Sequence, residues 1–265
     1  MDKALLIRVG ADSGNSKILS PVFPQKDNEF VFLPLGDNSD GIKINSTTKV
    51  YNKELLPYLG EDVPNSWLHL DPYFNEEEKI YTYGDRTHSD SFNSIPQKQK
   101  LLQLENGDYL FFCGTFLEMD KEDYKICNRN EIIKKQKIKQ KHLYLFGYFK
   151  VKEVHTINSE TPMGKKDEIA NLHINNAHII RRDHFDEEYL PKEHPEKKLI
   201  LILGNSVGSK LLKKAIKLTN CKDGTHYLEE KWISYFNRKD FGSSIGLHEW
   251  IKNPKEFIEE IEKLQ

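Results

Sequence analysis

The stretch HLYLFGYFKVKEV, residues 142–154, constrains the fold more than any other feature of this sequence. Its side chains alternate in character for about a dozen positions, which predicts a long β-strand. Gly147 inside the stretch predicts a bulge or a bend. Upstream, Asn106-Gly107 stands between two apolar runs in LLQLENGDYLFFCGTF, residues 101–116, and predicts a β-hairpin. The middle of the chain is therefore expected to form a sheet.

The flanking segments predict a mixture of strands and helices. Strands are expected at residues 4–9, at 29–35 (broken by Pro34) and at 79–86, with a loop at 36–48. A further set of features is expected nearer the C-terminus: a strand, glycine turn and amphipathic helix in KKLILILGNSVGSKLLKKAIKL, residues 197–218, and a last helix at 253–265 capped by Asn253 and started by Pro254. The prediction is a single α+β domain, residues 1–265, with a mixed or antiparallel sheet.

Charge and composition exclude some classes of protein. The 265 residues carry 39 Lys and Arg against 41 Asp and Glu, which argues against non-specific coating of nucleic acid but not against a local basic face. Such a face could be the lysine-rich segment at 131–141, which otherwise is simply solvated. No stretch approaches the roughly 18 apolar residues of a membrane span, and the apolar residues 4–9 are too few for a signal peptide. We therefore expect a cytoplasmic protein without membrane contact.

Cysteine spacing gives no sign of a metal or disulfide framework. Cys113, Cys127 and Cys221 lie too far apart in sequence for a C-x-x-C pair, and Cys113 sits in an apolar run as a small core residue would.

The turn GADSGN, residues 10–15, places three polar side chains where the first strand ends. It is similar to the phosphate loop of actin-like ATPases, although the second Asp-x-Gly loop of that fold is absent. Asp12 and Asn15 could equally just shape the turn. The functional alternative makes Asp12 and Ser13 one wall of a site, with Arg8 on the preceding strand binding phosphate or pairing with an acid.

Two short motifs combine acids with histidine or tyrosine. In HLDPYF, His69 and Asp71 share one face if the chain is extended, so they could act as base and orienting acid, bind one metal, or form a surface pair at a turn. In TYGD, Tyr83 and Asp85 are the residue types that stack on a base and accept hydrogen bonds from its edge.

Two later motifs offer further candidates. NNAHIIRR contains Asn176, His178 and Arg181, and the first two project to one side if the segment is a strand, although a half-buried structural histidine explains His178 as well. In GNSVGSKLLKK, Ser209 and Lys210 follow Gly208 at the start of the predicted helix. They could form an anion site there, or Ser209 could be a plain helix cap.

Eight blocks in order together resemble the third type of nucleotide modification associated domain, a family of phages and bacteria. They cover about residues 3–217 and are KALLIRVGADSG, SPVFP, HLDPYF, YTYGD, GDYLFFCG, LYLFGYFKV, NNAHIIRR and GNSVGSKLLKKA. The chain departs from the family pattern at LPLGD, residues 33–37, where Asp37 would have to replace an expected acid. The resemblance implies a link to modified nucleic-acid bases, with possible operon partners in a modification or phage-defence system, but no settled reaction. Residues 101–155 are also similar to the core of PUA-like folds, including EVE and ASCH domains.

These observations support three hypotheses, of which the first is favoured. It is an enzyme acting on a nucleotide, or on a base in DNA or RNA, and its candidate residues are Asp12, His69, Asp71, Asp85 and His178 for catalysis and Arg8, Ser13, Tyr83, Asn176, Arg181, Ser209 and Lys210 for substrate binding. The alternative is a non-catalytic reader of modified bases, and its candidate contacts are Trp67, Tyr81, Tyr83, Arg181 and the lysines between 134 and 141. The third is a regulatory or scaffold subunit. The residues assign no cofactor, and the metal is unknown.

Overall fold

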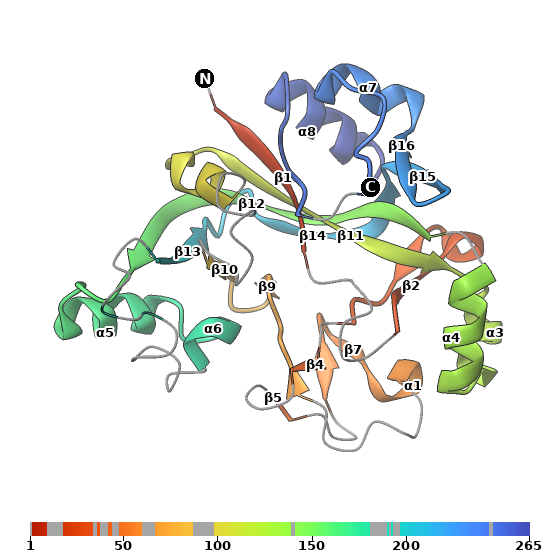
Figure 1. Ribbon diagram of the computed structural model, residues 1–265, viewed down its shortest axis with the longest axis horizontal. Coiled ribbons are helices and arrows are strands. Elements are labelled where there is room, and N and C mark those ends of the chain that lie inside the picture. Colours follow the sequence, from red (N-terminus) through yellow and green to blue (C-terminus); the bar gives the residue numbers. More distant parts are fainter. Residues whose placement is uncertain are drawn as a thin grey trace.

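The long strand expected around residues 142–154 is β12, Lys141–Ile157, and the main sheet is arranged about it. In the computed structural model this sheet curls into a half-barrel (Figure 1). The structure describes residues 2–9, 18–33, 36–37, 42–43, 48–59, 67–86, 98–138, 141–180, 190, 192, 197–243 and 246–265.

Strand β12 is long enough to pair with three neighbours. β11 (Tyr109–Glu118) runs antiparallel along its first half, and β14 (Lys210–Lys217) pairs with the same half on the other side. β13 (Leu199–Gly204) runs antiparallel along its second half. Strand β12 thus joins the part of the sheet that contains β11 to the part that contains β13.

The edges of the sheet make it mixed. On one side, β1 (Ala4–Arg8) lies parallel to β11, and β17 (His248–Trp250) lies antiparallel to β1. On the other side, β13 pairs with β10 (Ile80–Arg86), which pairs with β9 (Tyr73–Asn75). The prediction of an α+β fold with a mixed sheet is confirmed, whereas the PUA-like resemblance and the division into a single domain remain predictions.

The bulge predicted at Gly147 is confirmed. The register between β11 and β12 shifts there, because Phe112 pairs with Gly147 whereas Cys113 pairs with Leu145. A Cβ atom on Gly147 would lie 2.5 Å from Cζ of Phe74 and 3.1 Å from the backbone oxygen of Lys210. Glycine at this position therefore lets β9 pack closely against the middle of the sheet.

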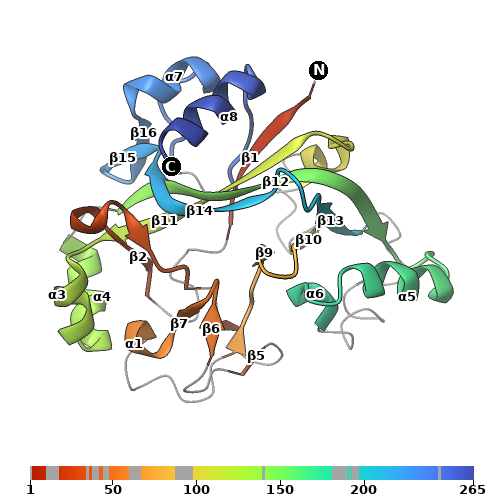
Figure 2. The same cartoon turned by 180° about the vertical axis from the view of Figure 1, so that it is seen from behind.

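The two faces of the sheet have separate apolar cores, because successive strand residues point to opposite sides. Leu6 packs with Trp232 and Phe257 under α7 (Glu230–Phe236), α8 (Pro254–Lys263) and the hairpin of β15 (Thr219–Lys222) and β16 (Thr225–Leu228). The other face is concave and rich in aromatic rings, where Phe74, Phe112 and Phe149 all contact one another. Figure 2 shows α7 and α8 covering one face only.

Two short strands extend this sheet: β2 (Ser20–Phe23) pairs parallel with the end of β11, and β3 (Glu29–Phe30) pairs antiparallel with β2. Other short elements surround it. They are the strands β4 (Gly36–Asp37), β5 (Ile42–Lys43), β6 (Lys49–Val50), β7 (Lys53–Glu54) and β8 (Trp67–Leu68), the helices α1 (Leu56–Leu59), α3 (Lys121–Ile126), α4 (Arg129–Ile138), α5 (Met163–Leu172) and α6 (Ala177–Ile180), and the 3-10 turns Pro24–Lys26 and Gln99–Gln103. None of the helices in the described ranges is long and apolar enough to cross a membrane.

Several local predictions are wrong. The helix expected after Gly208 is strand β14, since Lys210, Leu211, Ile216 and Lys217 pair along the free side of β12 and this tertiary pairing overrides helix propensity. The turn at Asn106-Gly107 forms, with φ of +98° at Gly107, but a 3-10 turn precedes it in place of a strand, so there is no hairpin. The strand expected at 29–35 is limited to β3, and the loop expected at 36–48 contains β4 and β5.

The C-terminal helix is confirmed, with a difference at its start. Pro254 is its first residue, and Asn253 precedes it as expected. However, Asn253 has φ of 50°, and its side chain accepts no hydrogen bond from the backbone of the helix. The start of α8 therefore depends on the fixed φ of Pro254 and not on a side-chain cap.

Candidate functional site

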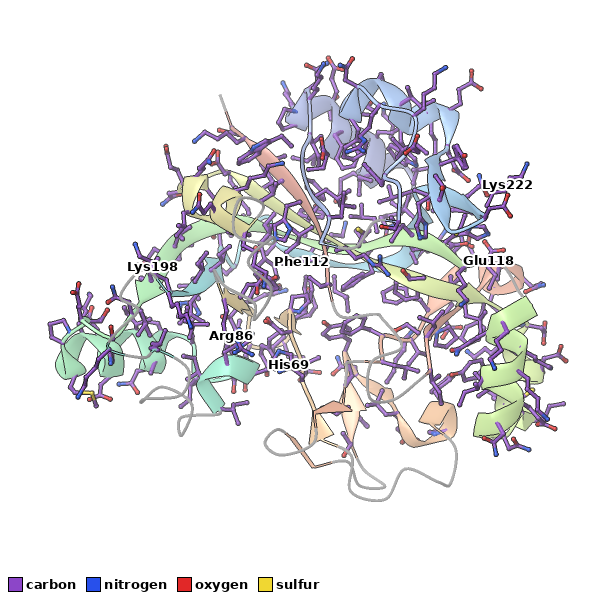
Figure 3. The ribbon with its side chains drawn as sticks, viewed as in Figure 1. His69, Arg86, Phe112, Glu118, Lys198 and Lys222 are labelled. Carbon is purple, nitrogen blue, oxygen red and sulfur yellow. The ribbon has the colours of Figure 1, made fainter. Side chains whose placement is uncertain are left out.

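His69, Asp71 and His178 come together although more than 100 residues separate the first two from the third. One ligand atom from each lies within 4.8 Å of the other two. His178 Nε2 is 3.4 Å from Asp71 Oδ2, and the rings of His69 and His178 meet edge to face with centroids 4.7 Å apart. We call this group the His–Asp–His cluster; Figure 3 shows His69 near α6, on the side of the sheet away from α7 and α8.

Asp71 is positioned by the end of strand β9. The register that pairs Tyr73 with Thr82 would, if continued, place Asp71 opposite Gly84. Pro72 has no N–H to continue the ladder, and β9 ends at Tyr73. The Asp71 carboxylate takes the place of the missing strand, because both its oxygens accept from the Gly84 backbone N–H at 3.1 Å.

Asn176 positions both Asp71 and His178. It is fully buried, its Nδ2 donates to Asp71 Oδ1 at 3.3 Å, and its Oδ1 accepts from the His178 backbone N–H at 2.9 Å. The segment is not the strand on which the two side chains were expected to project together; it is the turn that starts α6. The structure nevertheless brings them together, because the Asn176 side chain caps this turn.

Gly84 is a part of the site that the sequence reasoning missed. A Cβ atom there would lie 2.7 Å from His178 Cδ2 and 2.8 Å from Asn176 Oδ1. Glycine is thus needed for α6 to approach β10. An isolated glycine inside a strand is a known sign of close approach, so YTYGD did contain the signal.

The environment of Asp71 favours a bound cation. The residue is 6% exposed, and burial raises the pKa of its carboxyl well above the usual range; the Gly84 N–H lowers the pKa, the charge of Asp85 raises it, and Asn176 lowers it. A buried carboxylate is costly unless it is paired or coordinates a metal. A cation beside Asp71 would offset that cost.

The donor set of the cluster is that of a transition-metal site. Two imidazoles and one carboxylate suit zinc or non-haem iron, and three protein ligands leave coordination positions for water or substrate. Two ligand atoms about 2.1 Å from one ion are about 3.4 Å apart at a tetrahedral angle. The separation of His178 Nε2 and Asp71 Oδ2, 3.4 Å, matches this spacing.

Tyr83 and Asp85 do not join the cluster. Asp85 accepts from Lys98 Nζ at 2.6 Å and from the Tyr83 hydroxyl at 3.2 Å. Tyr83 is only 6% exposed and packs against Phe112, with ring centroids 5.4 Å apart. The ring of Tyr83 therefore belongs to the core of the concave face, which argues against the prediction that it stacks on a base.

Arg8, Ser209 and Lys210 lie elsewhere. Arg8 projects to the same face as Leu6, and its Nη1 donates to the Ser243 backbone oxygen at 3.3 Å. Ser209 Oγ accepts from the Lys150 backbone N–H at 3.1 Å, and Lys210 Nζ bonds Glu262 at 2.7 Å. The helix start on which their predicted anion site depended does not exist.

The remaining candidates lie outside the described residues. These are Asp12, Ser13, Asn15, Arg181 and the side chains of Asp37 and Trp67.

A second histidine pair, of which His173 is buried and His155 is half-buried, lies on the α5–α6 side of β10. Thr82 Oγ1 is 2.5 Å from His173 Nδ1, His173 Nε2 is 3.0 Å from His155 Nδ1, and His155 Nε2 is 3.1 Å from Glu153 Oε2. Each of these hydrogen bonds has one donor and one acceptor if both rings are neutral. Thr82 then donates to His173, His173 to His155 and His155 to Glu153. Burial, together with the charge of His155, lowers the pKa of His173 to about 3.

This low pKa predicts a loss of stability in acid. The unfolded chain protonates His173 below about pH 6.5 and the folded protein does not, so the stabilisation present above that pH is lost as the pH falls. Between pH 7 and pH 5 this residue should remove about 2 kcal/mol from the free energy of unfolding. The variant His173→Gln keeps an acceptor for Thr82. Between pH 7 and pH 5 its free energy of unfolding should fall by about 2 kcal/mol less than that of wild type.

Urea denaturation of both proteins at the two pH values measures the difference. Equal losses in wild type and His173→Gln would contradict the assignment of a buried neutral imidazole.

Comparison with known proteins identifies one match. A family model described as nucleotide modification associated domain 3 matches residues 3–261. No curated protein and no solved structure matches significantly. The resemblance drawn from eight short motifs is confirmed, and it extends beyond residue 217, where the motifs ended.

Proposed function

The chain belongs to the nucleotide modification associated domain 3 family, and from this premise we propose that it is an enzyme that alters a base or a nucleotide. The proposed active site is the His–Asp–His cluster, with His69, Asp71 and His178 holding a divalent metal ion. The family description links the chain to nucleotide modification but names no reaction, so the chemistry has to be argued from the site.

The observation that carries the proposal is the convergence of three ligand atoms within 4.8 Å. Asp71 is buried and both histidines are largely enclosed, as in sites that keep bulk water from a reaction. Structural zinc sites are usually closed by four protein ligands, whereas catalytic ones keep a position open. Within the described residues the cluster offers three ligands, which favours catalysis over a purely structural ion.

The surrounding residues would hold the ligands in place. Gly84 N–H and Asn176 Nδ2 fix the Asp71 carboxylate, and Asn176 Oδ1 fixes the backbone at His178. A metal at such a site supplies a Lewis acid that activates water or polarises a substrate atom. Such partners of metal ligands commonly determine ligand orientation and affinity.

The test is mass spectrometry of nucleosides after incubation with the protein. DNA, RNA and free nucleotides are each incubated with wild type or Asp71→Asn, with zinc, manganese or ferrous ion, and with a chelator as the metal-free control. We expect a mass change with the metal-loaded wild type only. A change that persists in Asp71→Asn, or with the chelator, would show that the cluster is not the active site.

A reader of modified bases is the second candidate. The exposed lysines Lys134 and Lys137 of α4 favour it, since phosphate contacts supply most non-specific affinity. Against it, Tyr81 and Tyr83, expected to line its pocket, are 1% and 6% exposed and belong to the core. Salt-dependent retention of oligonucleotides by both wild type and Asp71→Asn, without any mass change, would favour the reader.

A further inference from the structure

A cavity of about 330 Å³ lies between the β6–β7 hairpin and the start of β14. We call it the β14 cavity. Ligand sites in proteins range upward from about 300 Å³, so this volume suits one small molecule and not a nucleic-acid strand. The side chains that shape it include Phe30, Phe32, Tyr51, Lys53, Glu76 and Lys213.

One side of the β14 cavity is apolar and aromatic. Phe32 and Tyr51 stack with ring centroids 5.6 Å apart and an angle of 17° between their planes. Phe32 is almost fully buried, and Tyr51 is half-buried. Because Phe32 also stacks with Phe146, a flat aromatic ligand would contact the ring of Tyr51, and aromatic surfaces pack favourably against one another.

The other side of the β14 cavity is lined by charged residues, the lysines Lys53, Lys210 and Lys213 and the carboxylate of Glu76. Lys53 and Lys210 already pair with Glu29 and Glu262. Lys213 is exposed and makes no ion pair within the described part of the chain, so its charge is available to an anion.

Tyr51 connects the cavity to the His–Asp–His cluster. Its hydroxyl donates to the Pro72 backbone oxygen at 2.5 Å, and Pro72 follows Asp71 directly. Its ring also meets Phe74 of β9 edge to face, with centroids 5.4 Å apart. The wall of the cavity is therefore also a support of the segment that carries the metal ligand.

We propose that the β14 cavity binds a mononucleotide, with the base against Tyr51 and the phosphate at Lys213. An aromatic ring beside a lysine matches a flat base joined to an anion. The identification of this flat anion as a nucleotide rests on the proposed function.

The test is calorimetric titration of the full chain with AMP, CMP, adenosine and inorganic phosphate, in the presence of a chelator. Without metal, the result does not depend on the chemistry at the His–Asp–His cluster. We expect at least one mononucleotide to bind, and its nucleoside or inorganic phosphate to bind about tenfold more weakly. Absence of binding by both mononucleotides would overturn the proposal.

Substitutions in the β14 cavity test whether the mononucleotide binds there. Lys213→Glu should weaken mononucleotide binding about five- to tenfold, and Leu211→Trp, which fills the cavity, should weaken it at least tenfold. Lys222→Glu is the charge-matched control on β15, and its affinity should stay within about twofold of wild type. Equal binding by wild type, Lys213→Glu and Leu211→Trp would place the nucleotide elsewhere and overturn the proposal.

The two proposals can fail separately. If Asp71→Asn binds the mononucleotide like wild type but no product forms in any reaction, the proposal for the β14 cavity is supported and the proposal of an enzyme is contradicted. If products form while neither cavity variant changes nucleotide binding, the enzyme stands and the cavity proposal fails.

Discussion

Asp71→Asn is expected to lower the affinity for divalent metal by more than about 100-fold and to abolish base modification. Loss of a residue that merely orients a metal ligand typically costs 10- to 100-fold in affinity, and loss of a ligand should cost more. Asparagine has nearly the shape of aspartate but carries no charge, and with two histidines alone the cluster cannot balance a divalent ion. The measurement is calorimetric titration with zinc and manganese.

The same variant should keep its fold, which separates metal binding from folding. The Gly84 N–H still finds an acceptor in the asparagine oxygen, and removal of a buried charge relieves the desolvation that raises the pKa of Asp71. The free energy of unfolding of the metal-free protein should therefore be equal to that of wild type or higher.

Asp120→Asn is the matched control for this prediction. Asp120 caps helix α3 through the backbone N–H groups of Glu122 and Asp123, and asparagine caps helices equally well. This control should bind metal like wild type. Unchanged metal affinity in Asp71→Asn, or an equal loss in Asp120→Asn, would contradict the assignment of Asp71 as a ligand.

The sequence predicted the residues of the cluster better than their assembly. The spacing of His69 and Asp71 suggested ligands or a base on one face, and NNAHIIRR supplied His178. Their convergence depends on the end of β9 at Pro72 and on the turn at Asn176, neither of which a periodic pattern reveals. Asn176 and His178 can both be recognised as candidates from their own motif, but only the tertiary structure shows that both contact the Asp71 carboxylate.

The failures have a common physical cause. Strand β14 was predicted as a helix because Leu211, Leu212, Ala215 and Ile216 fit a helical face, yet the segment pairs along β12 through residues that include Leu211 and Ile216. Tyr83 was assigned to a pocket, although the curl of the sheet turns its ring onto Phe112. In both cases a contact distant in sequence decided the outcome, and local propensity carries no information about such contacts.

Trp232→Ala is expected to be the most destabilising of the substitutions considered. Trp232 is a fully buried residue of α7, its ring centroid lies 5.4 Å from that of Phe257, and its Nε1–H donates to the Lys217 backbone oxygen at 2.8 Å. Truncating a buried tryptophan typically costs about 3–5 kcal/mol through lost contacts and the cavity left behind. Denaturation in urea measures the change in the free energy of unfolding.

Trp232→Phe isolates the contribution of ring volume. It keeps an aromatic ring against Phe257 but leaves the Lys217 oxygen without its donor, so it should cost about 1–3 kcal/mol, less than alanine. If both variants cost the same, the hydrogen bond and not packing would dominate at this position.

Metal affinity of the folded Trp232→Ala protein should equal that of wild type, because the two sites lie on opposite faces of the sheet (Figure 1). Substitutions that share no contacts usually act independently, so a loss of stability in the helical layer need not move His69 or Asp71. Zinc titration of Trp232→Ala well below its denaturation midpoint checks this. A tenfold loss of metal affinity there would show that the helical layer, through β11 and β12, helps to position the His–Asp–His cluster.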